Sequence, residues 1–406
     1  RSRMAHDPTF KFTMARAIYK GVLKYICNVH QNTDFCVQPL PVRNLSAIVN
    51  PYNNEVRITW FPTEDTLEPS AQPTHYIIYC SAGDKGYDNG ILVSANETSV
   101  TLSIDPGVLY RFRVCAVNEG GKSLSKQEVC AYLSTPESKN ILMVDGFQRL
   151  AGPLPVDDET MRGFRLDIDP GVIDVKSPVY CGNQYIFSKD SWNTIGESSN
   201  ELEGMILAGN THDYSSQYAR DIITGGMSFN ISSCVSTSLP TINTTPFHLI
   251  NLIFGAQKQD GYSIGRYKTF TSELITSISD FASRGGNLLL SGAFVGSDMQ
   301  TPEERIFTSN VFKYNYEQSL PLDSITSIDG MNTSVQVYHK PNETHYWIRT
   351  ADVLRGTEGS FCTMLYKSTD LPCAIAYQGS DRKALSFGFP LECITDEKIR
   401  RDIINA

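Results

Sequence analysis

The sequence predicts a multidomain chain: one helix, then an all-β sandwich, then an α/β domain. Residues about 39–136 contain short alternating apolar runs with turn signals roughly every ten residues, which is typical of a β-sandwich. Residues 138–406 contain continuous apolar strands separated by helices, which is typical of an α/β sheet covered on both faces. The length of 406 residues suffices for two or three domains.

Residues 1–30 predict the last helix of a preceding domain. Apolar residues recur at helical spacing after Asp7-Pro8, at Phe10, Met14, Ile18, Val22 and Tyr25. A lone helix of this length does not bury its apolar face, so we expect that face to pack on the rest of the chain or on a missing domain. Arg1 is not an initiator Met and no signal peptide follows it, which favours a piece of a longer product. Residues 31–38 predict a linker.

The sandwich region carries the most specific pattern in the chain. Val56, Ile58 and Trp60 alternate in one predicted strand, and Tyr110, Phe112 and Val114 alternate in another after a turn at residues 105–107. Residues 39–136 therefore resemble a fibronectin type III domain, with Trp60 as the core Trp of its B strand and Tyr110 at its tyrosine corner. The resemblance implies a spacer or a protein- or glycan-binding module, not catalysis.

Ten cysteines are present, and no two have the C-x-x-C spacing of zinc ribbons or redox motifs. The strand alternation points Cys115 and Cys130 away from the sandwich core on neighbouring strands. The two thiols are therefore placed either to form a cross-strand disulfide or to remain free.

The α/β region predicts a series of buried strands and three helices. The expected strands cover residues 141–144, 205–208, 249–254, 288–290, 373–377 and 384–387. The expected helices cover residues 214–223 and 270–282, with a closing helix from Thr395. Residues 330–372 are more strand-like and predict a β insertion.

Ligands of open α/β sheets bind beyond the carboxyl ends of the strands. The candidates there are Asp145, His212, Asp213, Gln257 and Ser291. His212, Asp213 and Ser291 have the residue types of a nucleophile–base–orienter set, although a His-Asp pair before a helix is also typical of an N-cap. The seven His are scattered, and only His339 and His345 are close in sequence, so we expect no metal and no cofactor in this chain.

The α/β region also resembles the flavodoxin-like fold of class I glutamine amidotransferases and their ThuA-like relatives. In the amidotransferases, a strand–turn–helix elbow carries a Cys nucleophile and a later segment supplies a His. The matching elbow at residues 290–296 has Ser291 and no Cys, and the matching segment at residues 387–392 has no His. The resemblance thus implies the fold and argues against amidotransferase activity.

Residues 10–25 are similar to the last helix of zinc-dependent N-acetylmuramoyl-L-alanine amidases. That resemblance implies a secreted bacterial protein with an amidase domain, a fibronectin type III domain and a flavodoxin-like domain, an architecture often labelled amidase or xanthan lyase. The zinc ligands and the catalytic Glu of such a protein would precede Arg1. Zinc is therefore expected only in the missing amidase domain.

Two functions follow. In the first, the chain is the non-catalytic targeting region of a secreted, periplasmic or cell-surface amidase and binds peptidoglycan or another surface polysaccharide. In the second, the α/β domain is itself a polysaccharide hydrolase or lyase, which would use paired carboxylates from candidates such as Asp157, Asp158, Asp167 and Asp169. A purely structural surface protein is a third reading.

Charge argues against nucleic acid and an anionic membrane surface as partners, and hydropathy argues against a membrane span. The net charge is −9 and no Lys/Arg-rich run occurs, so nothing favours nucleic acid. No apolar stretch approaches the roughly 18 residues of a membrane span.

Overall fold

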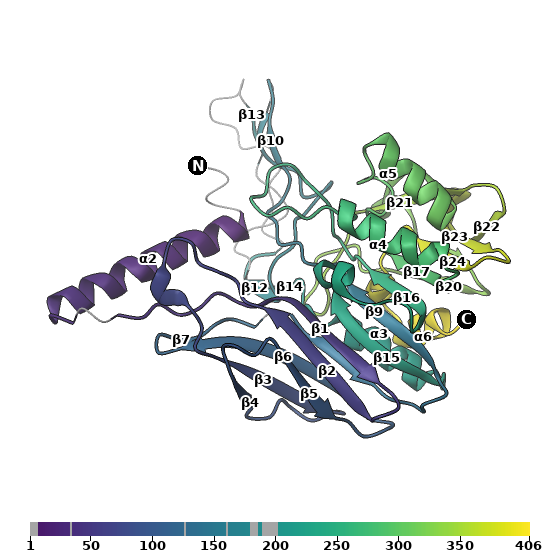
Figure 1. The fold of residues 1–406 in the computed structure, drawn as a ribbon. Coiled ribbons are helices and arrows are strands. Elements are labelled where there is room, and N and C mark those ends of the chain that lie inside the picture. Colours follow the sequence, from purple (N-terminus) through teal and green to yellow (C-terminus); the bar gives the residue numbers. More distant parts are fainter. Residues whose placement is uncertain (1–6, 33–34, 126, 160, 179–185, 189–201) are drawn as a thin grey trace.

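The computed structural model describes residues 7–32, 35–125, 127–159, 161–178, 186–188 and 202–406. Residues 1–6 of the expected helical region, residues 33–34 of the expected linker, and Cys181 lie outside these ranges. Two β-rich parts and one long helix make up the described chain (Figure 1).

The first part is a two-sheet sandwich. One sheet contains β1 (Arg43–Asn50), β2 (Glu55–Phe61) and β5 (Ser99–Ser103). The other contains β4 (Ile91–Ser94), β3 (His75–Ala82), β6 (Leu109–Asn118) and β8 (Val129–Tyr132), with the short β7 (Gly121–Lys122) beside β6. Trp60 is fully buried between the sheets, with its ring centroid 5.3 Å from that of Tyr76. The Tyr110 hydroxyl accepts a hydrogen bond from the Asp105 N–H at 3.2 Å, which is the tyrosine-corner contact.

Five parallel strands form the centre of the second part. Their order across the sheet is β15 (Phe229–Val235), β9 (Lys139–Asp145), β16 (Phe247–Ile253), β17 (Asn287–Ser291) and β24 (Lys383–Phe387). In chain order these are strands 2-1-3-4-5, one of the two common doubly wound orders. The switch in direction lies between β9 and β16.

Both faces of this sheet are covered. Ile141 and Met143 of β9 face one apolar cluster, which includes α3 (Tyr214–Thr224) and α6 (Glu397–Ile404). Leu142 and Val144 face the other cluster, which includes α4 (Ser272–Ser283) and α5 (Pro302–Phe307). Successive residues of one strand thus face different clusters, which explains why the strand is apolar at every position.

Antiparallel strands extend the sheet beyond β24, so that the whole sheet is mixed. They are β23 (Leu371–Gln378), β22 (Ser360–Tyr366), β19 (Ile328–Gly330) and β20 (Thr333–Val335). A separate pair, β18 (Tyr314–Pro321) and β21 (Thr350–Gly356), packs nearby. The region predicted as a β insertion at residues 330–372 contributes β20 and β22 to the extended sheet and β21 to the separate pair.

The structure describes five short strands between β9 and α3, and none of them belongs to the central sheet. The strands β10 (Pro155–Asp157), β11 (Met161–Phe164) and β13 (Ile186–Ser188) form a small sheet. The apolar run at residues 205–208 does form β14 (Ile206–Ala208), but β14 pairs with β12 (Lys176–Pro178) and not with the central sheet. Our prediction of a fully buried strand there was wrong, because one of its apolar residues, Ile206, is half exposed.

Strand β15 joins the two parts into one sheet. One edge of β15 pairs in parallel with β9, while its other edge pairs antiparallel with β1 at Ser46–Cys234 and Ala47–Ser233. The same edge contacts β8 at Ile231–Tyr132, so β15 touches both sheets of the sandwich. We call this shared strand and its partners the seam.

Polar side chains of β15 complete the seam. The Ser233 hydroxyl accepts a hydrogen bond from the Cys130 N–H at 2.6 Å and donates to the Cys130 carbonyl at 2.8 Å. The Ser232 hydroxyl accepts from the Val49 N–H, and the Asn230 side chain accepts from the Ser134 N–H. Buried backbone groups that would lack a strand partner are thereby satisfied.

Cys115 and Cys130, the two cysteines that could have formed a cross-strand disulfide, are not bonded to each other. Register pairs Cys130 with Arg111 and Cys115 with Ile77, and both cysteines are free. Cys130 points away from the sandwich core as predicted, but the second part of the chain covers it completely. Of the two alternatives, the structure contains the free thiols.

Helix α2 (Pro8–Val29) is a long rod at one side of the molecule, and it points away from the α/β part (Figure 1). Its N-cap Asp7 is buried and accepts a hydrogen bond from the Ile264 N–H of the α/β part at 2.7 Å. Arg16 pairs with Asp65 and Lys24 pairs with Glu68, both of the sandwich.

The apolar face of α2 does not pack on this chain. Ile18, Val22, Tyr25, Ile26 and Val29 are 48–69% exposed. We expected this face to pack either on the rest of the chain or on a missing domain, and the first expectation is wrong for these residues. The helix contacts the sandwich through its charged side chains instead.

We expect Ser233→Ala to lower the free energy of unfolding by about 1–3 kcal/mol, because it leaves the buried Cys130 N–H and carbonyl without partners at the seam. Ser283→Ala, at an exposed position in the last turn of α4, is the matched control and should change stability by less than about 0.5 kcal/mol. Urea denaturation measures both. An unchanged midpoint for Ser233→Ala would show that the seam contributes little.

Candidate functional site

The carboxyl ends of the parallel strands gather the polar residues that the sequence singled out. Asp145 ends β9, Gln257 follows β16, and Ser291 ends β17. Glu392, in the turn after β24, joins them at the same edge. All four are nearly or fully buried.

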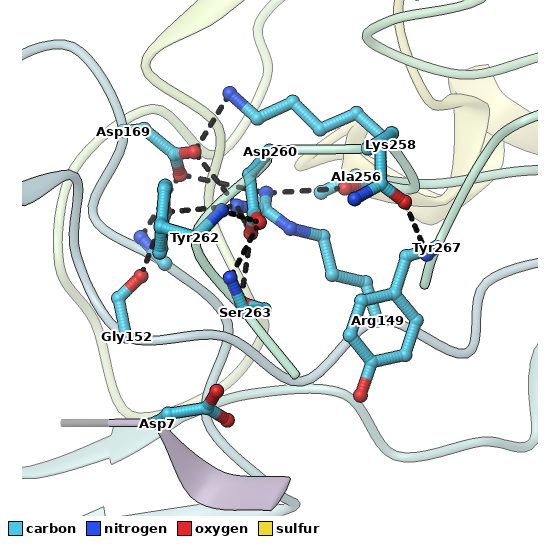
Figure 2. Close-up of polar contacts among 12 residues, drawn as sticks. Asp7, Arg149, Gly152, Asp169, Ala256, Lys258, Asp260, Tyr262, Ser263 and Tyr267 are labelled. Carbon is cyan, nitrogen blue, oxygen red and sulfur yellow. Dashed lines mark hydrogen bonds and ion pairs between the residues drawn. The ribbon is translucent and has the colours of Figure 1, made fainter. Parts of the chain in front are cut away.

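A buried ion cluster centred on Arg149 lies where the loops after β9 and β16 meet, at the switch between these strands (Figure 2). Arg149 is 0% exposed. Its guanidinium contacts the Asp169 carboxylate at 2.7 Å and the Asp260 carboxylate at 3.1 Å, and it donates to the Tyr262 hydroxyl at 3.3 Å. Lys258 approaches Asp169 from the other side at 2.7 Å.

The cluster holds its own loops in place. The Gln257 side-chain oxygen accepts from the N–H groups of Gln148 and Arg149, both at 2.9 Å, and the Tyr262 hydroxyl donates to the Gly152 carbonyl. Arg149 and Lys258 lower the pKa of Asp169 well below its usual range despite burial, which raises it. Each charge has its counter-charge here, so the cluster positions loops rather than offering a free anion site.

A second buried network surrounds Glu392. Its carboxylate accepts from the Tyr218 hydroxyl at 2.8 Å and from the Tyr346 hydroxyl at 2.7 Å. The Tyr218 hydroxyl also contacts the Ser291 hydroxyl at 2.9 Å. Burial raises the pKa of Glu392, and burial raises the pKa of Asp145 to about 8, with the Glu392 charge adding to the shift.

A cavity of about 510 Å³ lies beside Glu392, between α3, α6 and the loop around His345. Three arginines line it: Arg220, Arg400 and Arg401. Arg400 is already paired with Asp221 at 2.7 Å. Mixed charges therefore line this cavity, with no single sign that would select a charged ligand.

The three residue types of a hydrolytic set do not meet. The Ser291 hydroxyl contacts Tyr218, and the His212 Nε2 contacts the Asp174 carboxylate at 3.3 Å. The Asp213 carboxylate accepts from the Thr211 hydroxyl and the Gln217 amide, and it makes no side-chain cap to α3 although it occupies the N-cap position. None of the hydrogen bonds described for His212, Asp213 and Ser291 joins two of the three.

A cysteine–histidine pair that sequence reasoning missed lies at the cavity. The Cys393 sulfur is 3.8 Å from His345 Nδ1, which also contacts the Tyr346 carbonyl at 2.8 Å. Burial lowers the pKa of His345 to about 4 and raises the pKa of the Cys393 thiol well above its usual value. The pair is therefore a neutral thiol beside a neutral imidazole, which is not an activated nucleophile.

The other sequence candidates have structural partners. Asp167 pairs with Arg165 at 2.6 Å on the surface, and Asp169 belongs to the Arg149 cluster. His339 contacts the Val337 carbonyl. Over the part of the chain that the structure describes, no group of three His, Cys, Asp or Glu side chains could hold a metal ion.

The comparisons with known proteins identify the first part. The family model of the fibronectin type III domain matches residues 40–130, so this part of the chain is a fibronectin type III domain. A mouse protein named "Neuronal cell adhesion molecule" is 26% identical over 164 residues. The match covers 39% of this chain and 13% of that protein's length.

Segments of this chain also match two solved structures of fibronectin domains. The FN1–FN3 domains of chicken CNTN1 are 17% identical, cover 25% of this chain and 33% of that chain, and have a TM-score of 0.22. An FN3 domain of human collagen XX is 21% identical, covers 24% of this chain and 98% of that chain, and has a TM-score of 0.19.

Fibronectin type III domains are generally binding or adhesion modules and occur in extracellular proteins, which is consistent with a non-catalytic binding role. No helix among the described residues is long and apolar enough to cross a membrane.

We expect Asp169→Asn to lower the free energy of unfolding at pH 7 by roughly 3–5 kcal/mol, because Arg149 keeps its buried charge and loses its nearest partner. The exposed Asp167→Asn is the matched control and should cost at most about 1 kcal/mol.

The cost of Asp169→Asn should also depend on pH. A carboxylate with a depressed pKa stabilises the fold above its unfolded pKa near 4 and loses that effect as the pH falls further. The cost should therefore shrink below about pH 4. A cost that is equal at pH 7 and pH 3 in urea titrations would contradict the assignment.

Asp145 should behave in the opposite way. Its pKa is raised in the fold to about 8, so the folded state holds a proton that the unfolded state releases near pH 4, and stability falls between these values. Asp145→Asn should therefore gain stability relative to the native chain from pH 4.5 to pH 8, by at most about 1.4 kcal/mol per pH unit. Urea titration at both pH values measures this gain; an equal difference at the two would refute it.

Proposed function

We propose that this chain is a non-catalytic binding region of an extracellular protein, in which the two domains act as one rigid body that attaches an enzyme to a surface polysaccharide such as peptidoglycan. The observation that carries the proposal is the state of the strand-end side chains. Ser291, His212 and Asp213 are each engaged with a different partner, so neither His212 nor Asp213 acts as a base for Ser291. The thiol of Cys393 lies beside His345, but that pair is neutral and not activated. The fibronectin type III domain supports a binding role.

We also assign residues 138–406 to a flavodoxin-like domain. The parallel order 2-1-3-4-5 supports this assignment, as do the helices on both faces. The connection from β15 to β16 departs from the pattern, because a short 3₁₀ segment, η2 (Ser236–Thr241), replaces a crossover helix.

The enzyme in this proposal is an amidase-like domain that packs on α2. The exposed stripe that contains Ile18, Val22 and Tyr25 supports it, since a water-facing apolar stripe on a docked helix is typical of an interface. Zinc would belong to that domain. The proposal of secretion rests on the domain type alone. Disulfides would have been a second argument for secretion, but none of the nine described cysteines forms one.

A second candidate function is hydrolysis or lysis of a polysaccharide at the strand ends. The 510 Å³ cavity beside the buried acid Glu392 favours it, because a carboxyl group with a raised pKa is a suitable general acid. Against it, both Glu392 oxygens are bonded to tyrosine hydroxyls.

Cosedimentation with insoluble peptidoglycan tests the two functions together. We expect the purified chain to sediment with peptidoglycan and to release no soluble sugar or peptide, as measured by mass spectrometry of the supernatant. Cellulose particles, which lack N-acetyl groups, are the control polymer. Failure to sediment overturns the binding role. Product that disappears in Glu392→Gln overturns the non-catalytic role.

A further inference from the structure

The cavity of about 510 Å³ beside Glu392 is lined by charged side chains that do not pair with one another. Asp213 and Arg220 come from the start and the body of α3, and Glu397 and Arg401 come from α6. Among the residues that the structure describes, none forms an ion pair with any of these four side chains. Two guanidinium groups and two carboxylates thus share one cavity without a charged partner.

Each of these four side chains has charged atoms that solvent can reach. The Asp213 carboxylate accepts both of its hydrogen bonds on Oδ1, so Oδ2 has no partner within the described chain, and it is not shut off from solvent. In Arg401, only Nε is buried without a partner, which leaves the two terminal nitrogens of the guanidinium accessible. Arg220 and Glu397 are exposed residues. A ligand in the cavity could therefore contact all four groups.

The other charged groups of the cavity already have partners. Arg400 pairs with Asp221 at 2.7 Å, and both Glu392 oxygens accept hydrogen bonds from tyrosine hydroxyls. Neither sign exceeds the other among the groups that remain. A purely anionic or purely cationic ligand would be attracted by two of them and repelled by the other two. A ligand that carries both an ammonium and a carboxylate would be attracted by all four.

We propose that this cavity binds a zwitterionic ligand, namely the ammonium and carboxylate groups of a peptidoglycan stem peptide. The ligand carboxylate would accept hydrogen bonds from Arg220 and Arg401, and the ligand ammonium would donate to Asp213 and Glu397. The volume of about 510 Å³ lies within the range of ligand pockets, which is about 300–1,000 Å³.

The inference rests on the proposed function and names the part of the polymer that is recognised. The N-acetylated sugars of peptidoglycan carry no ammonium group, whereas its stem peptides carry a diamino acid and free carboxylates. A neutral sugar would displace water from the four charges without offering a counter-charge, which is costly. The charge pattern therefore favours the peptide over the glycan strand.

Saturation-transfer NMR and calorimetry with meso-diaminopimelic acid test the proposal on the full chain. This probe carries an ammonium and a carboxylate at each end. Pimelic acid and cadaverine are the matched controls, because the first lacks the ammonium groups and the second lacks the carboxylates. We expect the diamino acid to bind and neither control to bind at the same concentration. Equally tight binding of either control would overturn the zwitterion assignment.

Two substitutions each remove one charge from the cavity. Arg401→Gln should weaken binding of the diamino acid roughly threefold to tenfold, because a half-buried charged donor is lost. Asp213→Asn should weaken it by a similar factor, and its amide oxygen can still accept the two hydrogen bonds made to Oδ1, which guards against a folding defect. Lys398→Gln, at an exposed position of α6 outside the cavity lining, is the matched control and should bind as the native chain does. Native affinity in both cavity variants would overturn the assignment.

Cosedimentation separates this inference from the proposed function. Chitin carries N-acetylated sugars without peptides, so we expect the chain to sediment with peptidoglycan and not with chitin. Equal sedimentation with both polymers would overturn the stem-peptide assignment and leave the binding role standing. Sedimentation with peptidoglycan but no binding of the diamino acid would overturn the cavity assignment alone. Loss of both interactions overturns both.

Discussion

The pairing of strand β15 with both domains at once is the constraint on which the rest of the molecule depends. An edge strand of a parallel sheet exposes a row of unpaired N–H and C=O groups, which invites association with other chains. In this chain, β1 and β8 of the sandwich cover that edge. The cover is partly backbone and partly side chain, because Ser232 and Ser233 bond to the backbone of β1 and β8, respectively.

The seam determines how the loops of the two domains and helix α2 lie relative to one another. It brings the loop of Gln127 against the loop of Gln148, where the two side chains are hydrogen-bonded. It also fixes the distance that α2 spans from Ile264 to Asp65. The Arg149 cluster lies at the carboxyl ends of β9 and β16 and holds the loops that follow these strands. The loop after β9 carries Gln148, and the loop after β16 carries Ile264, whose N–H bonds to Asp7.

Local sequence signals predicted the parts of the fold that depend on local order. The alternation around Trp60 and Tyr110 sufficed for the fibronectin type III domain, and apolar runs located β9, β16 and β17. Strand β15 was missed because its Asn230, Ser232 and Ser233 interrupt the apolar pattern. Those polar residues are there to bond the sandwich, a long-range requirement that no local pattern contains.

The candidate site also has a part that the sequence predicts and a part that it does not. That Asp145, Gln257 and Ser291 end parallel strands could be predicted, and the structure does bring them to one edge. Their partners could not, because Tyr218 and Glu392 come from distant segments. The contact of His212 with Asp174, 38 residues away, was equally hidden.

Hydrogen–deuterium exchange of the β1 and β15 amides would test most directly whether the two domains are one rigid body. If the seam is intact, amides of Ala47 and Ser233 open only with the whole molecule and exchange as slowly as those of β9. If the β1 amides that face β15 exchange orders of magnitude faster than β9 while the sandwich stays folded, the domains separate in solution. That result would contradict a rigid two-domain body held together at the seam.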